Sequence, residues 1–167
     1  MWYVVQTLKG RERKVLDEIL QCVTQENENA FIIENEKMYK HQGEWHVERE
    51  NLFAGYLFID TRQPEEFNKR LQKQDRTLKL LTVDGRITPI REDEEKRLLL
   101  LGGEDHVVKY SEGFKDGDVV RITSGALKGF DGEIKRMDRH NRRAQVMIPL
   151  FGRDTPITLG LGIVKST

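Results

Sequence analysis

Residues 117–134 read Gly117-Asp-Val-Val-Arg-Ile-Thr-Ser-Gly-Ala-Leu-Lys-Gly-Phe-Asp-Gly-Glu-Ile134. Apolar and charged residues alternate on both sides of a segment that Gly125 and Gly129 bracket. A period of two is typical of half-buried strands, so we expect one strand around Val120 and Ile122 and a second over residues 130–135. Glycine adopts positive φ at little cost and suits the sharp bend between them. The same pattern also fits an ordinary small β-barrel in which the glycines only form turns and have no binding role.

Composition is compatible with one medium domain or two small ones, because the chain has 167 residues of which 37% are hydrophobic and 34% are charged. The net charge is zero, but it is unevenly distributed. Residues 114–167 contain ten Lys/Arg and six Asp/Glu, so the preceding residues carry the compensating negative charge. This asymmetry indicates two modules with different partners, and the basic one suits nucleic acid. The alternative is that the uneven distribution of charge is chance variation without functional meaning.

Several function classes are excluded. No apolar run approaches the ~20 residues of a membrane helix, and no signal segment precedes the first predicted strand. The single cysteine, Cys22, cannot form an internal disulfide, which suits a reducing cytoplasm. No phosphate-binding loop is present. The histidines lack metal-ligand spacing; they are His41, His46, His106 and His140. We therefore expect a cytoplasmic protein that is not an enzyme and has no metal or other cofactor.

The first hundred residues alternate between strand and helix patterns. Period-two and period-3.6 patterns predict, in order, a strand over 2–7, a helix from 11 to 23, a strand from 30, a hairpin tipped by Gly43, a central strand over 52–60, a helix from Pro64, a hairpin around Asp84-Gly85 and a helix over 91–101. This βαββαβ order is typical of a ferredoxin-like domain. We expect this domain at 1–103, a linker at 104–113 and an all-β domain at 114–167.

Two regions resemble one protein family. Trp2-Tyr3-Val4-Val5-Gln6-Thr7 and Phe53-Ala54-Gly55-Tyr56-Leu57-Phe58-Ile59 are similar to the NGN domain of NusG-type transcription factors. Residues 117–134, with the later run Ile148-Pro149-Leu150-Phe151-Gly152-Arg153, resemble the KOW domain of the same proteins. The resemblance covers nearly the whole chain in the family's order. It implies an α+β fold: a ferredoxin-like NGN domain with an antiparallel sheet and helices, followed by an SH3-like KOW β-barrel.

The resemblance also implies a function in transcription. Family members bind the β′ clamp helices of RNA polymerase through the NGN domain, and their KOW domain recruits a further partner. In housekeeping members that partner is a termination helicase or a ribosomal protein. Here Ala54 replaces the family's usual proline, and residues 110–114 and 138–144 are closer to LoaP, a specialised paralog whose KOW domain recognises a leader RNA hairpin. We favour a monomeric antiterminator of this kind. The housekeeping role is the alternative, and the acidic front half argues against a third possibility, a ribosomal protein.

The resemblance implies polymerase-contacting roles for Phe53 and Tyr56. On a regular strand their side chains would point to opposite faces, so one of them would belong to the core unless a bulge at Gly55 redirects it. In the family, a rim of the NGN domain lies near upstream or non-template DNA. The resemblance places four basic residues on this rim, where they would attract phosphates: Lys9, Arg11, Arg13 and Lys14. A solvated helix face explains these residues equally well.

The densest basic group surrounds a predicted turn near the C-terminus. Arginine forks suit phosphates and base edges, and an RNA hairpin offers both. The RNA-binding candidates are Lys128, Arg136, Arg139, His140, Arg142 and Arg143. A charged, solubilising hairpin is the alternative. Phe151 matches the aromatic residue with which housekeeping members bind their protein partners. The alternative is that Phe151 is simply buried in the core of the barrel.

Overall fold

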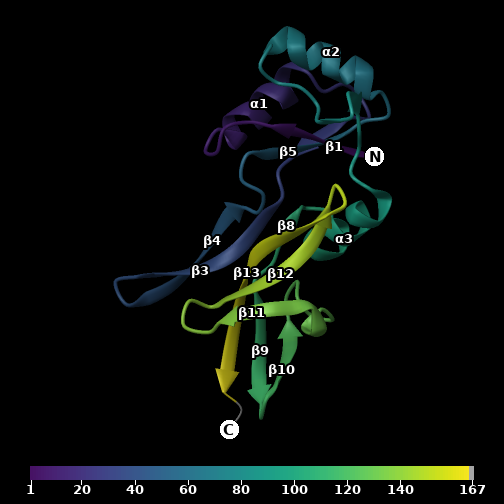
Figure 1. The fold of residues 1–167 in the computed structure, drawn as a ribbon. Coiled ribbons are helices and arrows are strands. Elements are labelled where there is room, and N and C mark those ends of the chain that lie inside the picture. The colour runs from purple at the N-terminus through teal and green to yellow at the C-terminus, as the bar shows by residue number, and fades with distance from the viewer. Residues whose placement is uncertain (166–167) are drawn as a thin grey trace. The chain divides into compact units, whose positions relative to one another are not determined.

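The computed structural model describes residues 1–165 and divides into two compact units (Figure 1). Unit 1 comprises Met1–Ile33 and Phe53–Glu95, and unit 2 comprises Glu34–Leu52 together with the chain from Lys96 onward. Both units mix strands with helical segments, which confirms the predicted α+β class. Within residues 1–165, no helix combines the length and apolar character that crossing a membrane requires.

Unit 1 is an antiparallel sheet with two helices on one face (Figure 1). The strand order is β1 (Trp2–Gln6), β5 (Tyr56–Asp60) and β2 (Asn29–Phe31). A single bridge between Val5 and Leu80 extends the sheet beyond β1. The helices are α1 (Glu12–Cys22) and α2 (Pro64–Gln74). The predicted sheet with helices on one face is thus present, with its fourth strand reduced to one bridge.

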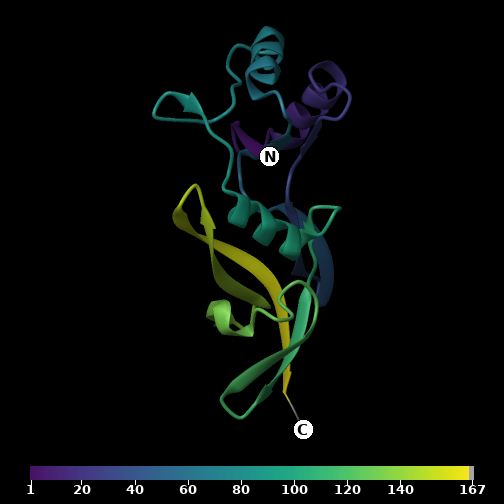
Figure 2. The same cartoon turned by 90° about the vertical axis from the view of Figure 1, so that its right-hand side faces the viewer.

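The core of unit 1 lies between the sheet and these helices. Alternation along the strands places every second apolar side chain on the helix side, and the helical period does the same for α1 and α2. The cluster comprises Tyr3, Val5, Val15, Leu16, Ile19, Val23, Ala30, Ile32, Leu57, Ile59, Phe67, Leu71, Leu78 and Leu80. Beyond it, β6 (Thr82–Val83) and β7 (Arg86–Ile87) form a short hairpin that is seen in teal in Figure 2. Its turn residues Asp84 and Gly85 both have positive φ, as a type I′ turn requires.

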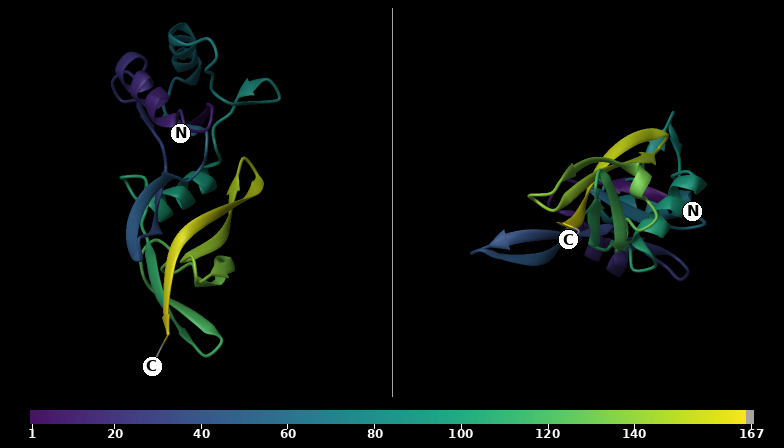
Figure 3. Two further views of the ribbon diagram at one scale, coloured as in Figure 1. Left: turned by 90° about the vertical axis from the view of Figure 1, so that its left-hand side faces the viewer. Right: turned by 90° about the horizontal axis from the view of Figure 1, so that it is seen from below.

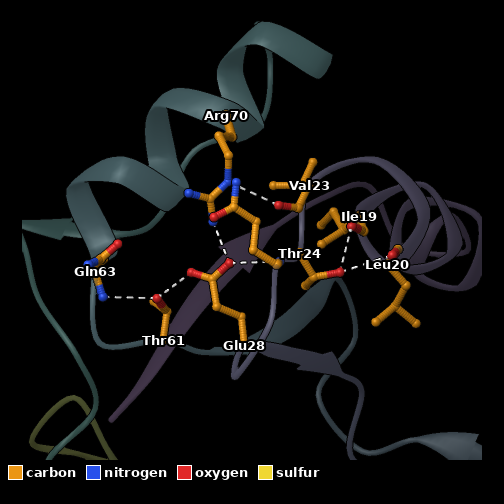
Figure 4. Close-up of polar contacts among 9 residues, drawn as sticks. Ile19, Leu20, Val23, Thr24, Glu28, Thr61, Gln63 and Arg70 are labelled. Carbon is orange, nitrogen blue, oxygen red and sulfur yellow. Dashed lines mark hydrogen bonds and ion pairs between the residues drawn. The ribbon is translucent and has the colours of Figure 1, made fainter.

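A polar cluster joins the end of α1, the end of β5 and α2 (Figure 4). Glu28 accepts hydrogen bonds from the Thr61 hydroxyl at 2.6 Å and from the Gln25 backbone N–H at 2.9 Å, and it pairs with the Arg70 guanidinium. Arg70 also donates to the Val23 carbonyl oxygen at 3.0 Å. Burial alone would raise the pKa of the Glu28 carboxyl, but these hydrogen bonds outweigh it and hold the pKa below its ordinary value.

Unit 2 contains a five-stranded sheet in the order β10 (Val119–Ser124), β9 (Ser111–Asp116), β13 (Arg153–Lys165), β12 (Arg143–Leu150) and β11 (Ile134–Asp138). The long strand β13 pairs antiparallel with β12 along its first half and parallel with β9 along its second half, and Figure 3 shows it in yellow. The predicted all-β character of this region is confirmed. The SH3-like closure into a barrel stays a prediction.

The predicted second KOW strand begins later than expected. Residues Asp131–Glu133 form the 3-10 turn η1 rather than a strand, and β11 begins at Ile134. The Asp131 carboxylate accepts a hydrogen bond from the Ile122 backbone N–H at 3.0 Å. This hydrogen bond ties η1 to β10, so the chain at Asp131 is held by its side chain rather than by strand pairing. The alternation at 130–134 was therefore a wrong guide to secondary structure.

Residues 34–52, which we expected within the N-terminal domain, belong to unit 2. They form the hairpin of β3 (Glu34–His41) and β4 (Glu44–Asn51), shown in blue in Figure 3. The Asn35 amide donates to the Thr158 carbonyl oxygen on β13 at 2.9 Å, and β8 (Val107–Val108) pairs parallel with β3. Gly160 permits the close approach of β3, because a Cβ there would overlap the Glu36 carbonyl oxygen.

The predicted linker is also structured. Residues 104–113 contain β8 and the first residues of β9, and α3 (Glu92–Gly102) begins in unit 1 and ends in unit 2. The boundaries of the two compact units therefore differ from the expected ranges of 1–103 and 114–167. As a division into NGN and KOW domains, those ranges stay a prediction.

Candidate interaction surfaces

The two candidate polymerase-contacting aromatics lie on a turn that precedes β5, not on a continuous strand. The Tyr56 backbone N–H donates to the Phe53 carbonyl oxygen at 3.0 Å, and Gly55 has a φ of 81°. This turn brings the rings of Phe53 and Tyr56 to a centroid distance of 6.3 Å in a stacked arrangement. The condition of a regular strand is not met, because the strand begins only at Tyr56 and the chain turns at Gly55, the position at which the sequence allowed a redirection. Phe53 is nevertheless in the core, as expected for one member of the pair.

The turn is fixed by the loop that leads into α1. The Thr7 backbone N–H donates to the Gly55 carbonyl oxygen at 2.8 Å. Glu12 is only 9% exposed, and its carboxylate accepts hydrogen bonds from the backbone N–H groups of Gly10 at 2.7 Å and Gly55 at 3.2 Å. The helical period by itself places Glu12 outside the apolar stripe of α1, so the sequence pattern gives no sign of this role. A buried carboxylate that satisfies two backbone donors holds the turn in a single position.

Further aromatic side chains gather around Phe53 on the sheet face opposite the helices. Phe58 lies 5.8 Å from Phe53, 5.8 Å from Phe31 and 6.1 Å from Trp2 between ring centroids. Trp2 contacts Phe31 edge-on at 4.9 Å. Phe53 is only 6% exposed, whereas Tyr56 is half-buried. Tyr56 therefore has side-chain surface that a partner can contact, whereas the other aromatic rings of the group are buried.

The candidate DNA-facing residues lie at the start of α1. Lys9, Arg11, Arg13 and Lys14 are all exposed. They flank the buried Glu12, so the segment that carries them is anchored while their side chains face outward. The geometry agrees with a phosphate-facing rim and equally with a solvated helix start.

The basic turn between β11 and β12 is ordered by a side-chain bridge. The Asp138 carboxylate accepts a hydrogen bond from the Asn141 backbone N–H at 3.1 Å and from the Asn141 side-chain amide at 2.7 Å. These hydrogen bonds hold the pKa of Asp138 below its ordinary value. The chain reverses at Arg142, which has a φ of 56°. Asp138 and Asn141 thus shape the turn that carries the basic side chains.

The structure separates the basic residues into two groups. Arg136, Arg139 and His140 are exposed, whereas Arg142 and Arg143 are half-buried. The Arg142 guanidinium lies 4.3 Å from the ring centroid of Trp45 on β4, and that of Arg143 lies 4.7 Å from the ring of Tyr39 on β3. Arg143 also donates to the Met38 carbonyl oxygen at 3.3 Å. Sequence reasoning missed both aromatics, which lie about a hundred residues away in the chain.

Lys128 is exposed on the loop between Gly125 and Gly129, apart from the β11–β12 turn in the sequence. This loop is held by Ser111, whose hydroxyl oxygen accepts a hydrogen bond from the Leu127 backbone N–H at 2.9 Å. Ser111 and Leu127 are both fully buried. The loop therefore presents Lys128 from a fixed base.

Phe151 and Gly152 form the two-residue loop between β12 and β13, and their φ values are 54° and 74°. Positive φ at both positions is the geometry of a type I′ hairpin turn. A bulky side chain rarely occupies this region because the conformation costs free energy. The half-buried Phe151 is thus held in a strained conformation at a loop tip.

Comparison with known proteins identifies the family to which the chain belongs. A family model described as transcription termination factor nusG matches residues 1–99, and a KOW motif model matches residues 117–148. The transcription termination/antitermination protein NusG of Thermus thermophilus is 28% identical over 180 residues, which cover 99% of this chain and 98% of that protein. The protein of the same name from Treponema pallidum is 27% identical over 180 residues, with 99% and 97% coverage.

A solved structure of Thermotoga maritima NusG, described as showing its domain interaction, has a TM-score of 0.54 and 27% sequence identity, and the match covers 95% of this chain and 92% of that one. The family model alone matches more than half of this chain. The nusG match precedes the KOW match along the chain. The chain belongs to the NusG family of transcription termination factors and carries a KOW motif.

Proposed function

We propose that this chain is a processive antiterminator of the LoaP kind. It binds the β′ clamp helices of RNA polymerase through the surface centred on Tyr56, and it binds a leader RNA hairpin through the turn between β11 and β12. Upstream or non-template DNA passes near Lys9, Arg11, Arg13 and Lys14. Relatives named as transcription termination/antitermination proteins support the general role.

The observation that carries the RNA part of the proposal is the ordered basic turn. A merely solubilising hairpin needs no fixed geometry. Here Asp138 and Asn141 fix the turn, and Arg142 and Arg143 are stacked on aromatic rings. A stacked guanidinium keeps its N–H edges available while its rotamer is restricted, which lowers the entropic cost of binding phosphates or base edges.

Replacing Arg139 by alanine is expected to weaken binding of hairpin RNA and to flatten its salt dependence. Arg139 is exposed on the turn, and each lost phosphate contact lowers the slope of log affinity against log salt by about 0.7–0.9. The measurement is fluorescence anisotropy with the full chain against hairpin RNA, single-stranded RNA and duplex DNA at several salt concentrations. Arg62→Ala, an exposed arginine of unit 1, is the matched control and should leave the slope unchanged.

Two results would contradict the RNA proposal. An unchanged slope in Arg139→Ala would remove the turn from the interface. Weak binding without preference for the hairpin would favour the housekeeping alternative, in which the KOW region takes a protein partner. The strained backbone at Phe151 supports that alternative, because strain at a loop tip is retained where function requires it.

Replacing Tyr56 by alanine is expected to weaken polymerase binding roughly 30-fold, the effect of losing a 2 kcal/mol aromatic hot spot. Tyr56 offers exposed aromatic surface and stacks on Phe53, which fixes its ring. The measurement is equilibrium binding of the full chain to core RNA polymerase. Hairpin RNA binding by the same variant should be unchanged.

Val83→Ala serves as the control for Tyr56→Ala, since it also removes an exposed apolar side chain from unit 1. It should bind polymerase normally. If Tyr56→Ala lost RNA and polymerase binding equally, a folding defect would explain both. If it lost neither, the polymerase surface would have to be elsewhere on the chain.

A further inference from the structure

A small polar pocket lies beside the basic turn in unit 2. Its volume is about 200 Å³, and it is lined by Tyr110, Glu112, Gly113, Phe114, Thr123, Arg139, Arg142 and residues 162–164. This is smaller than the usual 300–1,000 Å³ of a small-molecule site. It admits a single planar heterocycle rather than a whole helix. Two arginines and one glutamate line this small pocket, so its lining carries charges of both signs and suits a ligand with both acidic and hydrogen-bond donor groups.

The walls of the pocket are held in place by their surroundings. Trp45 stacks on one face of the Arg142 guanidinium at 4.3 Å. The Thr123 hydroxyl donates to the Glu112 carbonyl oxygen at 3.1 Å, where the pairing of β9 with β10 shifts register. Bulges of this kind often redirect side chains next to binding sites. Gly162 leaves room for the Tyr110 phenol, which a Cβ at that position would overlap.

Charges of both signs act on Tyr110, which lines the pocket. Burial raises the pKa of the Tyr110 phenol above its ordinary value, the Arg142 guanidinium works against this rise, and Glu112 adds to it. Both Glu112 and Arg142 are therefore within electrostatic reach of the same ring. The pocket combines an aromatic ring, a guanidinium and a carboxylate acceptor.

Chemical groups of these three kinds suit the recognition of a single RNA base. Unpaired bases stack on aromatic rings or on guanidinium planes and are recognised by their Watson–Crick edges. A carboxylate only accepts hydrogen bonds, and it accepts two at once from neighbouring donors. Guanine alone presents two adjacent donors on this edge, the N1–H and the 2-amino group. Adenine, cytosine and uracil each place an acceptor beside their donor, and a carboxylate repels that acceptor.

We propose that this pocket binds one unpaired guanine of the RNA, with the Glu112 carboxylate on its Watson–Crick edge and with Arg139 and Arg142 against the ring and the adjoining phosphate. The inference rests on the proposed RNA-binding function and gives it a sequence preference. Glu112, Tyr110 and Trp45 then join the RNA site, with Trp45 as a positioning residue for Arg142.

The test uses the full chain and hairpin RNAs that share one paired stem and a loop of uridines. One guanosine is moved through the loop position by position, and inosine, which lacks the 2-amino group, replaces it in a second series. At one or more positions guanosine should bind about tenfold tighter than inosine, because one hydrogen bond to a charged acceptor is lost. Glu112→Gln should bring the two affinities to within about twofold, since the amide presents a donor in place of one acceptor.

Asp118→Asn is the matched control. It removes one negative charge from an exposed carboxylate near the tip of the same β9–β10 hairpin, so it should strengthen RNA binding generally and keep the guanosine preference. Equal binding of guanosine and inosine at every loop position would overturn the pocket while leaving RNA binding intact. A preference that survives in Glu112→Gln would overturn the role of the carboxylate. Failure of the chain to bind any hairpin would overturn the proposed function as well.

Discussion

Replacing Arg70 by methionine is expected to lower the free energy of unfolding of unit 1 by about 1–3 kcal/mol, because Glu28 then loses its charged partner. Breaking a fully buried ion pair costs about 3–5 kcal/mol, but Glu28 and Arg70 are only partly buried. The Glu28 side chain is only 9% exposed and that of Arg70 is 23% exposed. Without Arg70, Glu28 keeps its hydrogen bonds from Thr61 and Gln25 but loses its counter-charge. Hydrogen exchange of the β5 amides measures this effect separately for unit 1.

Lys69→Met is the matched control, one residue earlier on α2. Lys69 pairs with Glu66, but their side chains are 71% and 61% exposed. Exposed pairs of this kind contribute about 0–1 kcal/mol, so the control should lose little stability. Equal losses in the two variants would show that α2 tolerates neither change and that the pair of Glu28 and Arg70 contributes no more stability than an exposed pair.

The same contact should appear in the acid dependence of stability. The pKa of Glu28 in the folded chain lies below its ordinary value of 4.5. Stability that comes from the charged carboxylate is then present above pH 4.5 and is lost as the pH falls through the folded pKa. The gap between the native chain and Arg70→Met should therefore narrow in this acidic range. A gap that stays constant down to acid pH would exclude the carboxylate as its source.

Local patterns predicted most of unit 1 because short-range chemistry determines it. Pro64 with the following acids begins α2, and the Asp84-Gly85 pair forms the expected turn. Such signals act over a few residues and do not depend on the rest of the fold. The central strand was predicted too long, because apolar composition alone does not reveal that Gly55 turns the chain before Tyr56.

Long-range contacts explain what the sequence did not predict. Residues 34–52 have an ordinary hairpin pattern, and nothing in them indicates that Asn35 bonds to β13 or that Gly160 makes room for β3. The basic residues of the KOW region were found from their density in the sequence. Their aromatic partners Tyr39 and Trp45 were not, because stacking on a distant hairpin leaves no local signal.

The KOW loop shows the same limit at single-residue scale. Gly125 and Gly129 bracket the loop and have nearly equal φ values of 91° and 89°, so sequence reasoning assigned both to the bend. Their surroundings differ. A Cβ on Gly125 would lie 2.6 Å from the Ser111 hydroxyl oxygen and would overlap the Tyr110 carbonyl oxygen, whereas a Cβ on Gly129 would meet nothing within 4 Å.

Gly125→Ala is accordingly expected to destabilise unit 2 by about 3 kcal/mol. Positive φ costs an L-residue about 1–2 kcal/mol, and forcing a methyl group into a packed site typically adds about 1–3 kcal/mol. The displaced Ser111 also accepts the hydrogen bond of the buried Leu127 backbone N–H. Hydrogen exchange of unit 2, and of the Leu127 amide in particular, measures the loss.

Gly129→Ala carries only the backbone penalty, since a Cβ there meets nothing within 4 Å. The difference between the two variants therefore measures the cost of the close contact at Gly125. Gly129→Ala should cost about 1–2 kcal/mol and leave the Leu127 amide protected. Equal losses would mean that the loop yields around Gly125 and that the packing on Ser111 is not rigid. Because Tyr110 also lines the proposed guanine pocket, Gly125→Ala should reduce the guanosine preference of the chain, whereas Gly129→Ala should retain it.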